Sequence, residues 1–118
     1  MSNGINKAIL LGHVGNIKEE RYTPDGRAVA NFSVATNYSY KDKLGVKQES
    51  TEWHNIVCFG KLAEIIFEYM KKGMQVYVEG KMRTSEYENK GGVKTRNTEI
   101  VANEVLFLGS QSPQNEPH

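Results

Sequence analysis

Residues 51–82 decide the fold, and they read TEWHNIVCFG KLAEIIFEYM KKGMQVYVEG KM. Apolar and polar residues alternate over residues 51–59 and again over 75–87, which is the period of a β-strand. Between them, residues 61–72 have the period of an amphipathic helix that Gly73 can cap. The segment therefore predicts a strand, a helix that covers a core, and a second long strand. The apolar face of this helix is expected to consist of Leu62, Ile65, Ile66, Tyr69 and Met70.

Further strands are predicted on either side of this segment. Residues 6–13 form a short apolar run ended by glycine, residues 28–40 alternate, and residues 94–108 supply a last strand after a hairpin loop at 88–92. Residues 22–26 carry Pro and Asp-Gly in the order that favours a tight turn. On the strand at residues 75–87, Val76, Val78, Gly80 and Met82 share one face, which is expected to face the core.

The order of three strands, one helix and two strands predicts an all-β fold with one helix. The best match is a five-stranded OB-fold, a Greek-key β-barrel with the helix between strands 3 and 4. An open α+β sheet with one helix is the alternative, but a closed barrel better explains strands this long around so small a core. We expect residues 1–108 to form this domain and the polar residues 109–118 to form a disordered tail.

Composition narrows the function classes. The chain has 15 Lys and Arg against 14 Asp and Glu, a net charge of +1, so total charge alone does not predict a nucleic-acid-binding protein. No apolar run is long enough to cross a bilayer, and the first residues lack the features of a secretory signal. Together with the single cysteine, Cys58, this predicts a cytoplasmic protein.

Residues of the types that catalyse reactions or bind metals are scattered along the chain. His13, His54 and Cys58 lack the spacing of metal ligands, and the chain has no P-loop spacing. We therefore expect no enzyme activity, no metal and no cofactor.

The aromatic residues of the third strand are predicted to face outward. Strand alternation puts Trp53 and Phe59 on one face and Ile56 and Cys58 on the other. Ile56 and Cys58 suit a barrel interior, which leaves the two aromatics exposed with Lys61 just beyond. The alternative is the reverse parity, in which Trp53 belongs to the core.

Two tyrosines extend this pattern along the predicted hairpins. Tyr40 ends the second strand and Tyr87 lies on the outer face of the fourth, each with a basic neighbour. An aromatic ring beside a cation binds unpaired nucleic acid without reading sequence, because every base has a π-face. Stacking contributes roughly 1–3 kcal/mol per base, so four such rings outweigh a net charge of +1.

Six motifs extend over most of the chain: NKAILLG at 6–12, RYTPDG at 21–26, AVANF at 28–32, TEWH at 51–54, FGKLAE at 59–64 and VYVEG at 76–80. In these residues the chain resembles the bacterial single-stranded DNA-binding proteins, a class that includes OB-fold strand binders. The resemblance implies a non-catalytic protein that coats and protects single-stranded DNA in replication, recombination and repair, without regard to sequence.

The resemblance also implies roles for individual residues. Tyr40, Trp53, Phe59 and Tyr87 are expected to stack on bases, and the tyrosines stand where the best-known members carry tryptophan. The expected phosphate contacts are Lys7, Arg21, Lys43, Lys61, Lys72 and Arg83. Asn3, Asn55, Ser85 and Glu86 stand where those members tend to be basic. Weaker binding, or a different mode of wrapping, is therefore expected.

A homotetramer is implied as well, built by pairing of first strands and stacking of dimers. The interface positions expected from it are Ala8, Ile9, Leu10, Leu11, His54 and Tyr77. The residues support part of this independently, since positions 8–11 are apolar on both faces of a strand. The resemblance also implies recruitment of replication and repair proteins through an acidic-tipped tail, which we expect only if such a tail follows residues 115–118.

Three other functions remain open at this point. A primosomal accessory protein resembles this family as a dimer, but the retained rings of Trp53, Phe59 and Tyr87 argue against it. A pure protein-interaction OB domain predicts no salt-dependent affinity for nucleic acid. An enzyme would need a catalytic cluster that the spacing does not provide.

Overall fold

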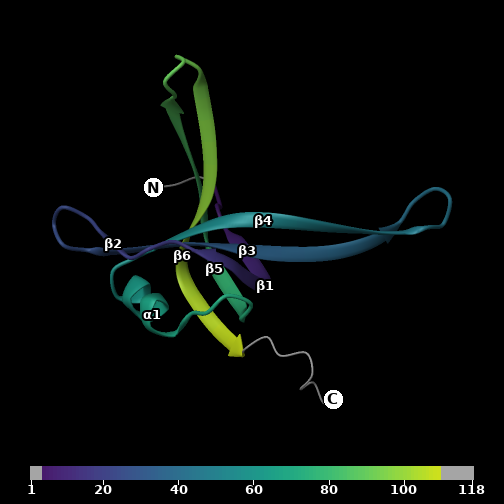
Figure 1. Ribbon diagram of the computed structural model, residues 1–118, viewed down its shortest axis with the longest axis horizontal. Coiled ribbons are helices and arrows are strands. Elements are labelled where there is room, and N and C mark those ends of the chain that lie inside the picture. Colours follow the sequence, from purple (N-terminus) through teal and green to yellow (C-terminus); the bar gives the residue numbers. More distant parts are fainter. Residues whose placement is uncertain (1–3, 110–118) are drawn as a thin grey trace.

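The chain folds into strands and one helix, as Figure 1 shows. The computed structural model describes residues 4–109, so the predicted tail beyond residue 109, and Asn3, lie outside the described residues. The elements are β1 (Ala8–Ile17), β2 (Arg21–Tyr22), β3 (Ala28–Lys41), β4 (Lys47–Phe59), α1 (Lys61–Tyr69), β5 (Gln75–Glu88) and β6 (Lys94–Gly109).

The five long strands close into a barrel. Their order is β1-β5-β6-β4-β3, and β1 also pairs with β3, which closes the ring. Neighbouring strands are antiparallel except β4 and β6, which run parallel through the pairs Ile56↔Ile100 and Val57↔Val101. The short β2 adds to β3 at Arg21↔Val29 and Tyr22↔Ala28. This confirms the predicted OB-fold and excludes an open sheet, because β1 has a neighbour on both sides.

Alternate residues of the long strands fill the barrel. Val34, Ile56, Cys58, Val76 and Val78 are completely or almost completely buried. Ile56 and Cys58 belong to the core cluster and Trp53 is exposed, which confirms the predicted parity of β4. Val57, on the face of Trp53, is also buried but lies outside that cluster. The interior is thus made of small and medium apolar residues, which suits a narrow barrel.

Helix α1 is shorter than predicted. It ends at Tyr69 because Met70 is already extended, and Gly73 does not cap it. Instead the Gly73 N–H donates to the Val14 carbonyl at 2.8 Å, so the chain after the helix is held against β1. Of the predicted apolar residues, Ile66 and Met70 are buried and Leu62 packs against the core, whereas Tyr69 is exposed.

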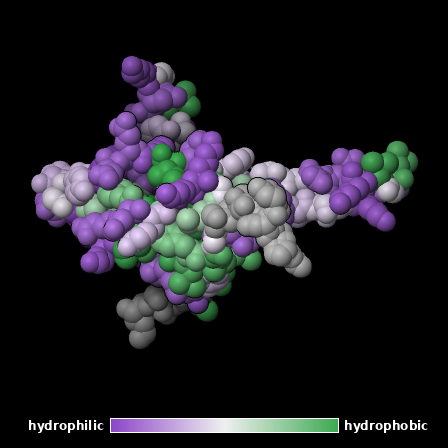
Figure 2. Space-filling model, turned by 60° about the horizontal axis from the view of Figure 1, so that its bottom comes forward, coloured by the Kyte–Doolittle hydropathy of each residue, from purple (hydrophilic) through white to green (hydrophobic). Residues whose placement is uncertain are grey.

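Two hairpins extend far beyond the barrel, one from β3–β4 and one from β5–β6 (Figure 1). Strand β4 begins at Lys47, before the predicted start, because its pairing with β3 continues to Lys41↔Lys47. The tip of this hairpin carries exposed Leu44 and Val46, which form the hydrophobic end of an otherwise hydrophilic arm in Figure 2.

Met82 was predicted to face the core and does not. It is half exposed because β5 leaves the barrel at this point to form its hairpin with β6. Its backbone N–H donates to the side-chain oxygen of Asn6 at 2.9 Å, which ties the start of the chain to the base of the hairpin.

Candidate nucleic-acid interface

The outer face of β3 and β4 carries polar and aromatic side chains, with the buried apolar residues Val29, Ala35 and Val57 between them. Directly opposed residues of antiparallel strands share a face, and the pairs here are Ala35↔Trp53, Ser33↔Asn55, Asn31↔Val57 and Val29↔Phe59. This face thus runs from Trp53 near the base of the β3–β4 hairpin to Phe59 beside the helix.

Three hollows lie along this face and share their walls. Asn16, Ser33 and Asn55 line both the hollow at Trp53 and the middle one. Asn31 and Glu99 line both the middle hollow and the one at Phe59. We call the three together the outer groove, whose charged lining residues are Lys18, Arg21, Lys72, Arg83 and Glu99.

Trp53 forms one end of the outer groove. Its side chain is 61% exposed, and its indole lies over Gly15, where an added Cβ would come within 2.3 Å of the ring atom Cζ3. Lys72 lines the same hollow. A flat, exposed ring beside a cation is what an unpaired base and its phosphate require.

Phe59 forms the other end, surrounded by arginines. The guanidinium carbon of Arg27 lies 4.9 Å from the centre of the Phe59 ring, a cation–π contact. Arg21 donates from Nη2 to the side-chain oxygen of Asn31 at 2.9 Å, and Arg83 forms an ion pair with Glu99. The turn that carries Arg27 is fixed by its N–H, which donates to the Thr23 hydroxyl at 2.9 Å.

The two hairpin tyrosines lie differently with respect to the outer groove. Tyr87 is 56% exposed and lies on the same strand face of β5 as Arg83, four residues farther along the β5–β6 hairpin. Tyr40 is 50% exposed and pairs with Gln48, on the strand face of β3 opposite to that of Trp53's partner Ala35. The structure therefore brings Trp53 and Phe59 to the outer groove, whereas Tyr87 and Tyr40 lie on the two hairpins outside its lining.

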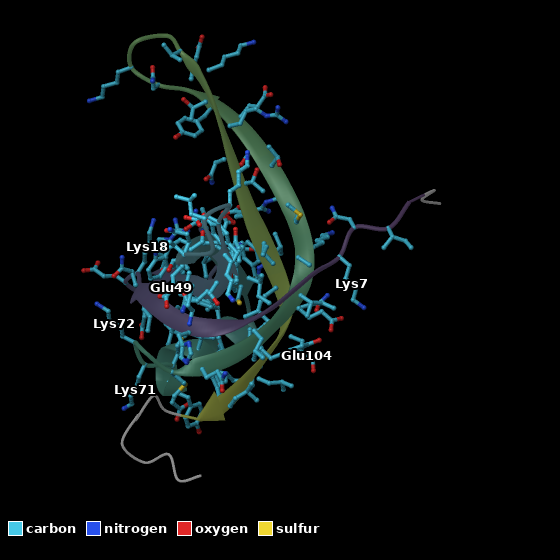
Figure 3. All side chains as sticks on the ribbon, turned by 90° about the vertical axis from the view of Figure 1, so that its right-hand side faces the viewer. Lys7, Lys18, Glu49, Lys71, Lys72 and Glu104 are labelled. Atoms are coloured by element: carbon cyan, nitrogen blue, oxygen red, sulfur yellow. The ribbon has the colours of Figure 1, made fainter. Side chains whose placement is uncertain are left out.

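The predicted basic residues also divide into groups. Arg21, Lys72 and Arg83 line the outer groove, Lys61 is exposed at the start of α1, and Lys43 lies at the tip of the β3–β4 hairpin. Lys7 lies on the opposite side of the barrel from Lys18 and Lys72 (Figure 3), with its Nζ 3.2 Å from a Glu79 carboxylate oxygen.

Several residues that line the outer groove were not predicted from the sequence. They are Lys18, Asn31, Ser33 and Asn97. Outside the groove, Tyr38 packs against Tyr40 with ring centres 6.0 Å apart. Alternation along the second predicted strand could have found Asn31 and Ser33, since they share a face. Asn97 could not be found this way, because its place depends on the register of β6 against β5.

The outer face of β1 and β5 forms a second, distinct surface. Ile9 and Leu11 are 56% and 54% exposed there, and the Tyr77 hydroxyl donates to Glu79 at 2.8 Å. That hydrogen bond and Lys7 lower the pKa of Glu79, and the Glu79 carboxylate raises the pKa of Tyr77. Ala8 and Leu10 pack against the core instead.

The groups considered for catalysis or metal binding have structural contacts. His54 is half-buried, with Nε2 3.0 Å from the Thr36 hydroxyl, and burial raises the pKa of the Cys58 thiol to about 12. Within residues 4–109 no group of three or more His, Cys, Asp or Glu is arranged to hold a metal ion. None of the helices in that part of the chain is long and apolar enough to span a membrane.

Comparison with known proteins settles the family. A model of the Single-strand binding protein family matches residues 5–108. The chain belongs to this family. A relative in Xanthomonas campestris pv. campestris, named single-stranded DNA-binding protein, is 50% identical over 111 residues, which cover 94% of this chain and 64% of that protein. The chain thus spans just under two thirds of that single-strand binding relative.

Two further comparisons agree. Single-stranded DNA-binding protein 1 of Chlorobaculum tepidum is 48% identical over 112 residues, covering 94% of this chain and 69% of that one. Among solved structures, the Plasmodium falciparum SSB in complex with ssDNA superposes with a TM-score of 0.83 at 31% identity, covering 92% of this chain and 98% of that one. Fold and family therefore point to the same group of proteins.

Proposed function

We propose that this protein binds single-stranded DNA without regard to sequence, and coats and protects it during replication, recombination and repair. The observation that carries the proposal is the outer groove, with an exposed indole at one end and a phenylalanine among arginines at the other. The relatives named single-stranded DNA-binding protein, and the Plasmodium structure in complex with ssDNA, support it.

The groove chemistry fits an unpaired strand better than a duplex. Trp53 and Phe59 offer ring surfaces to bases, which a duplex keeps stacked inside. Lys72 and Arg21 lie beside these rings and offer cations to phosphates. The amide and hydroxyl groups of Asn16, Ser33 and Asn55 between them can hydrogen-bond to any base edge, so the site tolerates every sequence.

The proposed contacts are the rings of Tyr40, Trp53, Phe59 and Tyr87 and the cations of Lys7, Arg21, Lys43, Lys61, Lys72 and Arg83. Because Lys7 and Tyr40 lie away from the outer groove, a strand that meets all of them has to pass around the barrel and along the β3–β4 hairpin. The proposal therefore includes wrapping of the strand over more than one face.

Assembly is part of the same proposal. Residues 8–12 of β1 pair with β5 on one side, and the pairing with β3 begins only at His13, so this segment keeps an open edge. An open edge flanked by exposed Ile9 and Leu11 suits pairing with a second copy. The proposed interface consists of Ala8, Ile9, Leu10, Leu11, His54 and Tyr77. Ala8 and Leu10 would contribute through the backbone of the open edge, because their side chains pack against the core. The proposed assembly is a homotetramer that acts without catalysis in the cytoplasm, on nucleoid DNA.

Fluorescence anisotropy with labelled oligo-thymidine tests the proposal. The wild-type protein is titrated into the single strand and into duplex of equal length, at low and at high salt. Tight, salt-sensitive binding to the single strand alone is expected, since each phosphate contact contributes about 0.7 to the log–log salt slope. Failure to bind either form would overturn the proposal and would favour the alternative function, that of a protein-interaction domain.

A further inference from the structure

Among residues 4–109, Glu99 is the one carboxylate that lines the three hollows of the outer groove. An adjoining hollow, which shares Lys18, Arg21 and Asn31 with them, holds a second carboxylate, Glu19. The other charged residues that line the outer groove are Lys18, Arg21, Lys72 and Arg83. A carboxylate in the path proposed for a polyanion opposes binding, so its presence at the centre of the groove needs an account. Glu99 lines both the middle hollow and the hollow at Phe59, which places it between the two ring sites.

The partner of Glu99 is a residue proposed to contact phosphate. Arg83 and Glu99 stand directly opposite each other in the β5–β6 register, and the Arg83 guanidinium forms an ion pair with the Glu99 carboxylate. The Glu99 side chain is only 15% exposed while that of Arg83 is 48% exposed. The carboxylate is thus the more desolvated partner, and it loses more when its cation turns to another anion.

From this geometry we infer that Glu99 competes with the DNA phosphate for Arg83 and so limits the affinity of the groove for single strands. This inference rests on the proposed function. A phosphate that approaches Arg83 either displaces Glu99 or shares the guanidinium with it, and in both cases two anions meet in one hollow. Arg83 therefore behaves as half of a neutral pair rather than as a free cation, which favours release of the strand.

An exposed carboxylate on α1 provides the control. Glu68 is exposed and lines none of the three hollows of the outer groove. Substitution of Glu68 by Gln changes the net charge by the same amount as substitution of Glu99, but away from the groove.

The experiment compares the affinities of wild type and four variants for oligo-thymidine at several salt concentrations. Glu99→Gln is expected to bind roughly threefold to tenfold more tightly than wild type, with a salt slope steeper by up to about 0.7. Arg83→Gln is expected to bind more weakly, because it leaves the carboxylate alone in the groove. The double variant, Arg83→Gln with Glu99→Gln, replaces an ion pair by a neutral pair, so its affinity is expected to be within about threefold of that of wild type. Glu68→Gln is expected to match wild type.

Two outcomes would overturn the inference while leaving the proposed function intact. If wild type binds and Glu99→Gln binds equally or more weakly, Glu99 positions Arg83 for the phosphate rather than competing with it. If Glu68→Gln tightens binding as much as Glu99→Gln, net charge alone is responsible. Wild type that does not bind oligo-thymidine would instead contradict the proposed function itself. Should Glu99→Gln unfold, Glu99→Thr removes the same charge with a side chain suited to a strand.

Discussion

At the scale of single residues, the proposed binding depends on how Trp53 packs against Gly15. The indole is exposed, yet it is held in place because it lies over the bare backbone of Gly15 and next to Ser33. A ring that is ordered before the strand arrives loses little conformational freedom on binding. The groove thus presents a prepared surface for a base.

Replacing Trp53 by Ala tests the role of this ring. The affinity for oligo-thymidine is expected to fall by about 1–3 kcal/mol, the contribution of stacking per base, with the thermal unfolding midpoint nearly unchanged. Tyr69→Ala is the control, since it removes an exposed ring from α1, away from the groove lining. A variant that fails to fold would show that Trp53 supports the core, contrary to the account.

Two glycines of β1 make a matched pair of tests. A Cβ at Gly15 meets the end of the Trp53 side chain, whereas a Cβ at Gly12 comes within 2.2 Å of the Ala35 carbonyl oxygen in the backbone of β3. Gly15→Ala is therefore expected to displace the indole and weaken binding with little loss of stability. Gly12→Ala is expected to lower the unfolding midpoint, because backbone of the barrel has to move. Equal loss of stability in both variants, by calorimetry, would contradict this distinction.

At the scale of elements, the β3–β4 hairpin depends on a carboxylate at its tip. One oxygen of Asp42 accepts from the backbone N–H groups of Leu44 and Val46, each at 2.9 Å, and the other accepts from the Gln48 side chain at 3.1 Å. These hydrogen bonds, that of Val46 foremost, lower the pKa of Asp42. The tip that carries Lys43 is therefore ordered by a charged group.

The sign of the pH dependence follows from that lowered pKa. Because the folded hairpin holds the carboxylate in its charged form, the stabilisation is fully present above the ordinary Asp pKa of about 3.9 and is lost as the pH falls through the lower, folded value. Asp42→Ala is expected to reduce hydrogen-exchange protection of the Val46 amide at neutral pH. Lys43→Ala, at the same tip, is expected to keep it. Equal protection in Asp42→Ala and wild type would contradict the role of the carboxylate.

Some features of the strands and the helix could be predicted from the sequence, and others could not. Alternation through Ile56 and Cys58 was enough to place the core face of β4 and the outward direction of Trp53. The end of α1 was not predictable, because Gly73 binds the Val14 carbonyl of a distant strand. The exposure of Met82 depends on where β5 leaves the barrel, and the alternation of apolar and polar residues does not predict that position.

The charged partners in the candidate site were hidden from the sequence for a related reason. Arg83 and Glu99 meet through the register of β5 and β6, which shifts at irregularities near Val76 and Gly80. The contact of Arg27 with Phe59 likewise joins a turn to the end of β4. The types of side chain in the groove could be predicted, whereas the pairing among them required the structure.

At the scale of the whole molecule, the barrel separates two surfaces. The outer groove runs over β3 and β4 and reaches β1 only at Gly15 and Asn16, while Ile9 and Leu11 lie on β1 next to the open edge of residues 8–12. A partner that pairs with residues 8–12 would therefore leave the groove accessible. This separation would let one chain carry out both the proposed assembly and the proposed strand binding.

Assembly can be tested by placing a charge on that second surface. Leu11→Glu is expected to lower the mass measured by light scattering from a tetramer to a smaller species, because a buried carboxylate without a partner is costly at an interface. Leu44→Glu, at the exposed hairpin tip, is expected to leave the mass unchanged. A wild-type protein that is monomeric at all concentrations would contradict the proposed assembly.

The central claim, that unpaired bases stack on the outer groove, is tested most directly by the intrinsic fluorescence of Trp53, the single tryptophan of the chain. Oligo-thymidine and duplex of equal length are added separately, at low and high salt. The account predicts strong quenching by the single strand, reduced by salt, and little change with the duplex. Tight binding of the single strand with unchanged emission, or equal quenching by the duplex, would contradict it.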